Sequence, residues 1–199
     1  MRRETMSHPK RLSKDGFSLI ELIVSIAISG IALVVITTTF VSQSQSYDIQ
    51  EQLVEMQQNA RAAMDIMTRE VRMAGYSPTG ASIVGVHYHS DKIHIRADIT
   101  GDGDQNDENE DIKYSYDAVN LRIERDAKLG KQTFAENIQD FTVSYFDYNG
   151  NPTTTSAEIR QIQITITART AEIDRNYPFN GGYHTYKLTS LVTPRNLAY

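Results

Sequence analysis

The first feature of the chain is one long apolar stretch near its start. Between Phe17 and Ile36, 15 of 20 residues are apolar, and Glu21 is the only charged one. An α-helix rises about 1.5 Å per residue, so a stretch of this length covers the roughly 30 Å of a bilayer core. We therefore predict a transmembrane helix over residues 17–41.

The same helix is predicted to continue beyond the bilayer. From Ile49 to Ala74, apolar residues recur every three or four positions, which is the spacing of an amphipathic helix. Between Phe17 and Ala74 the chain contains one glycine, Gly30, and no proline. We expect residues 42–75 to extend the helix as one continuous element, with Gly75 as the stop signal.

After residue 76 the pattern changes to an alternation of apolar and polar residues, which is typical of β-strands with one buried face. The alternating segments are 83–88, 92–96, 112–116, 120–124, 141–146, 159–168 and 186–192. Their short connections favour antiparallel hairpins. The amphipathic stripe of the helix can cover the apolar face of such a sheet. We therefore predict an α+β fold, in which the long N-terminal helix packs on an antiparallel β-sheet domain, residues 76–199.

Charge divides the chain into a basic leader and an acidic remainder. Residues 1–16 sum to +3, whereas the whole chain carries −5, so residues 17–199 carry −8. Phosphate binding needs clustered Lys and Arg, so an acidic chain argues against a nucleic-acid partner. A basic segment before an apolar run instead favours membrane insertion with the leader in the cytoplasm. The chain has no cysteine, which excludes disulfides and cysteine-based metal sites.

Two features of the apolar segment are unusual. A secretory signal is cleaved after its apolar run, but here the break in composition lies before the run, between Gly16 and Phe17. A carboxylate inside an apolar helix also costs roughly 2–3 kcal/mol to insert. Cleavage at the break would create an α-amino group four residues from Glu21, and the two charges could neutralise each other. The alternative is a simple single-pass anchor with its glutamate at the membrane interface.

The residues around this break resemble a known motif. Gly16-Phe17-Ser18-Leu19-Ile20-Glu21-Leu22, after a short basic leader, is similar to the prepilin-type cleavage and methylation motif. The resemblance implies that a prepilin peptidase removes residues 1–16 by cutting between Gly16 and Phe17, and that Phe17 is N-methylated. It also implies that Glu21 neutralises the N-terminus of a neighbouring subunit during assembly, and that the fold is that of type IV pilins.

Segments further along the chain resemble PilW-like minor pilins. These segments are residues 63–76, 137–141 and 192–197. The resemblance implies a minor type IV pilin that helps to initiate or cap pilus assembly, with other major and minor pilins and the prepilin peptidase as partners. The precursor would be a single-pass inner-membrane protein with a periplasmic or otherwise extracytoplasmic globular domain, and the mature chain would join a pilus at the cell surface. A type II secretion pseudopilin and a membrane-tethered calcium-binding module remain alternatives, and adhesion and motility are both open as roles.

An acidic loop over residues 98–111 is the one candidate cofactor site. It holds seven carboxylates in 14 residues and no cation, and oxygen donors alternate along it with a glycine after the third, as in calcium loops. The predicted calcium ligands are Asp98, Thr100, Asp102, Asp104, Asn106 and Glu110. The third position is threonine rather than aspartate or asparagine, and Glu110 comes one residue late. The alternative is a solvated acidic hairpin without an ion.

Three histidines lie close together in the sequence. His87 and His89 share one face of a predicted strand, and His94 lies on the next strand. Two strand histidines at this spacing can bind a transition metal, although such residues more often form a partly exposed sheet face. No glycine-rich phosphate loop, nucleophile elbow or other catalytic arrangement stands out in the sequence, so we predict that the protein is not an enzyme.

Overall fold

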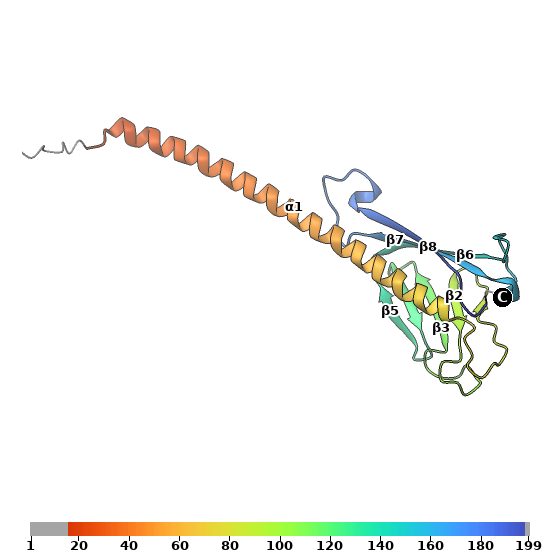
Figure 1. The fold of residues 1–199 in the computed structure, drawn as a ribbon. Coiled ribbons are helices and arrows are strands. Elements are labelled where there is room, and N and C mark those ends of the chain that lie inside the picture. The colour runs from red at the N-terminus through yellow and green to blue at the C-terminus, as the bar shows by residue number, and fades with distance from the viewer. Residues whose placement is uncertain (1–15, 198–199) are drawn as a thin grey trace, which may run out of the picture. The chain divides into compact units, whose positions relative to one another are not determined.

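The computed structural model describes residues 16–197. The predicted leader, apart from Gly16, therefore lies outside the described residues. The long helix is present as one element, α1 (Leu19–Met73), of 55 residues (Figure 1). The chain forms two compact units, one up to Tyr47 and one from Asp48 onward, and each is described here by itself.

In the first unit, α1 presents its apolar side chains on its surface. All residues from Leu19 to Val41 are exposed, and the helix is long and apolar enough to cross a membrane. Its hydroxyl side chains bond back to the helix, as when Ser25 Oγ donates to the carbonyl of Glu21 at 2.7 Å and Thr37 Oγ1 to that of Leu33 at 2.8 Å. Such internal bonds let polar side chains lie in hydrocarbon at low cost. The exposed apolar surface needs a lipid or protein environment.

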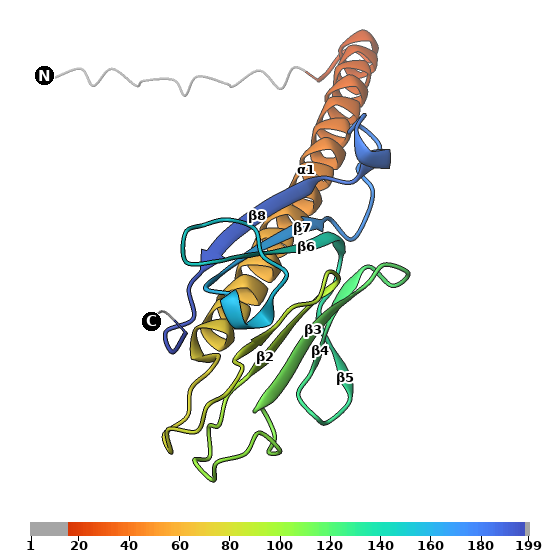
Figure 2. The same cartoon turned by 90° about the vertical axis from the view of Figure 1, so that its right-hand side faces the viewer.

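The second unit contains two antiparallel sheets (Figure 2). The five-stranded sheet runs in sequence order and consists of β1 (Val86–His87), β2 (Lys92–Arg96), β3 (Asp111–Asp117), β4 (Arg122–Asp126) and β5 (Lys131–Ala135). The three-stranded sheet consists of β6 (Ile138–Phe146), β7 (Gln161–Arg169) and β8 (Thr185–Val192). Two short 3-10 helices, η1 (Ser156–Glu158) and η2 (Asn180–Gly182), lie in the connections.

The predicted stripe of α1 packs into the core of the second unit. Ala60, Met67 and Val71 are fully buried, together with residues of both sheets such as Ile93 and Ile164. Burying a side chain as large as Val71 or Met67 stabilises a fold by about 1.5–3 kcal/mol. The prediction that one face of the helix covers an antiparallel β-domain is therefore confirmed.

The strand pattern differs from the prediction in three respects. The chain forms two sheets rather than one, because it leaves β5 and enters the second sheet through a turn at Asn137, whose φ is 56°. Strand β5 was not predicted, since its side chains are mostly exposed and carry no apolar alternation; backbone pairing with β4 alone defines it. The segment predicted over 83–88 contributes only the two residues of β1.

Candidate functional site

The start of α1 is closed by a reciprocal pair of hydrogen bonds. The backbone N–H of Ser18 donates to Glu21 Oε2 at 3.2 Å, and the backbone N–H of Glu21 donates to Ser18 Oγ at 3.3 Å. This is a capping box, in which two side chains satisfy N–H groups that the first helical turn leaves without partners. The spacing Ser-x-x-Glu was visible in the sequence, but the prediction gave Glu21 a role in assembly alone.

The predicted cleavage site lies just before this cap. Gly16 and Phe17 are exposed and non-helical, and the side chain of Phe17 is 88% exposed. No atom lies within 4 Å of the place where a Cβ on Gly16 would be. The capping box thus fixes the first helical residue at Leu19 and leaves the Gly16–Phe17 peptide bond outside the helix. A peptidase can approach this bond without unwinding a helical turn.

Two buried carboxylates organise the acidic loop through backbone N–H groups. Asp98 is fully buried and accepts from Gly101 N at 2.7 Å and from Gly103 N at 3.2 Å. Glu110 is also fully buried and accepts from the backbone N–H groups of Ile99 at 2.8 Å and Thr100 at 2.9 Å. Burial alone would raise the pKa of Glu110, but these bonds hold it below its ordinary value. Glu110 therefore orders the loop as a carboxylate, and Asp98 adds two further bonds to the backbone of the same loop.

Only part of the predicted calcium set comes together. Oxygen atoms of Asp102, Asp107 and Glu110 all lie within 4.8 Å of one another. Asp107 was not among the predicted ligands, although it is one of the acidic residues of the same loop. Asp104, which was predicted to bind through its backbone carbonyl, uses its side-chain Oδ1 to accept from Asn106 N at 2.7 Å. Of the predicted set, Asp102 and Glu110 belong to the cluster of carboxylates, and Thr100 Oγ1 donates to Glu110 Oε1 at 3.0 Å.

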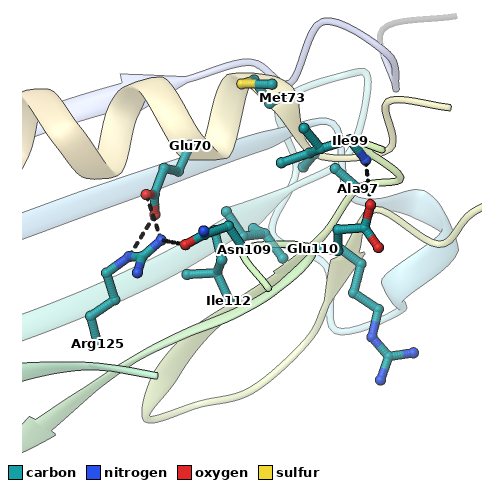
Figure 3. Close-up of a pocket in the computed structure, with 11 residues that line it drawn as sticks. Glu70, Met73, Ala97, Ile99, Asn109, Glu110, Ile112 and Arg125 are labelled. Atoms are coloured by element: carbon teal, nitrogen blue, oxygen red, sulfur yellow. Dashed lines mark hydrogen bonds and ion pairs between the residues drawn. The ribbon is translucent and has the colours of Figure 1, made fainter. Parts of the chain in front are cut away.

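An ion pair connects the end of α1 to the first sheet and to the acidic loop (Figure 3). Arg125 Nη2 donates to Glu70 Oε1 and to Asn109 Oδ1, both at 2.9 Å. The hydroxyl of the fully buried Tyr114 also donates to Glu70, and burial together with this carboxylate raises the pKa of Tyr114. Asn109 lies in the loop, so the network holds the loop against the helix.

A cavity of about 150 Å³ lies beside this network. Its lining includes Met73, Ile95 and Ile112, and Figure 3 shows the side chains of Met73 and Ile112 there together with Glu70 and Arg125. Pockets that enclose a small-molecule ligand usually measure about 300–1,000 Å³. This cavity is therefore too small to favour a substrate site.

Comparison with known proteins agrees with the motif at the start of the chain. Residues 49–180 match the family described as prepilin peptidase-dependent protein B, and residues 11–37 match the prokaryotic N-terminal methylation motif. Among solved structures, a type IV-like pilin from Thermus thermophilus is similar at 12% sequence identity and a TM-score of 0.46, over 71% of this chain and 97% of that chain. No curated protein gives a significant sequence match.

The two family matches cover the cleavage motif and the segments 63–76 and 137–141, whereas residues 192–197 lie outside them. The methylation-motif match includes Gly16, Phe17 and Glu21, and the family match covers most of the second unit. The narrower resemblance to PilW-like minor pilins stays a prediction. The chain is a type IV pilin-like protein and belongs to the prepilin peptidase-dependent protein B family.

Proposed function

We propose that the chain is a minor type IV pilin, a structural subunit that helps to initiate or cap pilus assembly after cleavage and N-methylation. The observation that carries the proposal is the exposed, non-helical Gly16–Phe17 bond directly before a capped apolar helix. That arrangement suits an inner-membrane precursor whose helix is later transferred from lipid to a filament. The other major and minor pilins would be its partners there.

Cleavage changes the electrostatics at the start of α1. It places a charged amine at Phe17, close to the Glu21 carboxylate in the sequence. Two opposite charges 4 Å apart attract by about 4 kcal/mol at an effective dielectric constant of 20. This attraction is comparable to the roughly 2–3 kcal/mol that a carboxylate costs in an apolar helix. The same reasoning holds for a type II secretion pseudopilin, which is the second candidate because it would share the processing and the helix.

Mass spectrometry of the mature protein tests the processing step. In a host that makes a prepilin peptidase, the chain should begin at an N-methylated Phe17. In the same host without the peptidase, it should retain residues 1–16 and stay in the membrane. An intact Met1 in the presence of the peptidase, or a start near Ser29 inside the apolar run, would support a simple membrane anchor instead.

Calcium binding by the acidic loop stays a prediction from the sequence. The oxygens of Asp102, Asp107 and Glu110 are the ones that converge, and Ca²⁺ takes carboxylate oxygens at about 2.3–2.6 Å. We expect millimolar Ca²⁺ to raise the melting temperature of the detergent-solubilised chain by about 2–4 °C.

A matched pair of variants distinguishes the converging carboxylates from the ligands that the sequence predicts. The double substitution Asp102→Asn with Asp107→Asn should remove the calcium response, whereas Asn106→Ala, at an exposed predicted ligand outside the cluster, should keep it. Loss of the response in Asn106→Ala would favour the predicted set. No response in the unmodified chain would leave the loop as an acidic hairpin without an ion and rule out the membrane-tethered calcium module.

A further inference from the structure

Three histidine side chains gather on the β1–β2 hairpin. His87 and His94 are cross-strand partners, and their rings stack with centroids 4.7 Å apart. His89, in the connection between the strands, stacks on His94 with ring centroids 5.5 Å apart. Only the two strand residues are paired by register, so the position of His89 is set by the tertiary structure.

The spacing of two ring nitrogens in this cluster suits a shared metal ion. His89 Nε2 lies 3.3 Å from His94 Nδ1. That distance is at the long end for a hydrogen bond between protein groups. Two imidazole nitrogens bound to one tetrahedral metal at 2.0–2.1 Å lie about 3.3 Å apart. The pair therefore fits metal ligation with little movement of either side chain.

A carboxylate orients the inner histidine of the pair. His94 Nε2 lies 2.8 Å from Asp111 Oδ1, and His94 is only 7% exposed. Asp111 also pairs with Arg96 at 3.0 Å and Lys113 at 3.3 Å. A carboxylate held in this way accepts a hydrogen bond, so the proton of His94 lies on Nε2 and the lone pair of Nδ1 faces His89. Metal-binding histidines characteristically use their second nitrogen in this manner.

Charged side chains around the cluster affect how strongly it can hold a cation. Lys92 and Lys113 add positive charge nearby and Asp91 adds negative charge. The cations oppose a divalent ion, so a moderate affinity is expected.

We propose that His89 Nε2 and His94 Nδ1 bind a divalent transition-metal ion of the class that prefers imidazole, with Zn²⁺ as its physiological representative. Asp111 orients His94 through its Nε2, and the ring of His87 stacks on that of His94. Water fills the open positions. This site is separate from the acidic loop, whose oxygen donors suit a harder cation.

Titration of the full-length mature chain in detergent, without a histidine tag, tests the site. We expect one equivalent of Zn²⁺ to bind at pH 7.5, and 1 mM Zn²⁺ to raise the melting temperature by about 2–4 °C. With Cu²⁺, electron paramagnetic resonance should show coupling to at least two imidazole nitrogens. Absence of zinc binding at 1 mM would overturn the proposal and leave His89 and His94 as a hydrogen-bonded pair.

Two histidine variants and one loop variant locate the ion. His89→Ala should abolish binding, and because His89 is only partly buried the variant should still fold. His184→Ala is the matched control, since His184 also bonds to a carboxylate, that of Asp174 at 3.1 Å, but lies elsewhere in the fold. It should bind zinc as the unmodified chain does, and so should the Asp102→Asn, Asp107→Asn double variant. Unchanged binding in His89→Ala would place the ion elsewhere and refute the site.

Discussion

Replacing Glu21 by glutamine should leave cleavage at Gly16–Phe17 intact and prevent incorporation into filaments. Glutamine can serve as the third helical residue of a capping box as glutamate does, so the bonds with Ser18 should persist. The variant removes only the negative charge that is proposed to neutralise the new amine at Phe17. Each 1.4 kcal/mol lost from subunit docking lowers incorporation about tenfold, so at least a tenfold loss is expected. Immunoblots of sheared pili, normalised to membrane-bound protein, measure it.

Ser18→Ala is the matched control because it removes the other half of the same motif. It deletes the hydroxyl that caps Glu21 N and should destabilise the helix start by about 1 kcal/mol, but it keeps the charge. Incorporation should therefore stay within a few-fold of normal. If Ser18→Ala lost incorporation while Glu21→Gln retained it, the function of Glu21 would be helix capping rather than charge neutralisation. The same variants tested in a secretion assay would distinguish a pseudopilin from a pilus subunit.

Among glycine-to-alanine substitutions in the second unit, Gly85→Ala should cause the largest loss of stability. An ideal Cβ on Gly85 would lie 2.2 Å from the backbone N and 2.5 Å from the Cα of Gly75. These are backbone atoms, held by the bond from Gly75 N to Arg96 O at 2.8 Å, so they cannot move aside as a flexible side chain would. Separating the segments would also strain the bond from Arg96 N to Gly85 O at 2.8 Å. We expect a loss of more than about 3 kcal/mol in the free energy of unfolding.

Urea unfolding followed by circular dichroism measures this effect, and Gly80→Ala provides the comparison. Gly80 has a φ of +73°, but no atom lies within 4 Å of its added Cβ. It should therefore lose only about 1–2 kcal/mol, from the left-handed backbone conformation. Equal midpoints for the two variants would mean that the packing of Gly85 against Gly75 does not limit stability.

The candidate site was predictable where its chemistry is encoded in neighbouring residues. Gly16, Phe17 and Glu21 follow from one short motif, and the structure adds Ser18 as the partner of Glu21. The calcium ligands were predicted from the ligand order of a standard loop, and they stay a prediction. In the folded loop the carboxylates of Asp98 and Glu110 bind backbone N–H groups, and Asp107 joins the converging cluster. A linear pattern cannot show which oxygens are already used by the backbone.

By itself, the sequence determined the elements that depend on local spacing. The apolar run, the stripe from Ile49 to Ala74 and the glycine stop specify α1, because helical hydrogen bonds and periodicity join residues only a few positions apart. Most strands follow from alternation for the same reason. These features together were sufficient to predict an α+β fold with one long N-terminal helix on antiparallel strands, and the prepilin-type motif added the resemblance to pilins.

Only the tertiary structure decided what depends on register between distant segments. The division into two sheets, the pairing of the exposed β5 with β4, and the approach of Gly85 to Gly75 are of this kind. So is the 3.3 Å contact of His89 with His94 and the carboxylate behind it. Backbone pairing is nearly independent of side-chain identity, so the residues of one strand do not specify which partner it takes or which side chains it brings together.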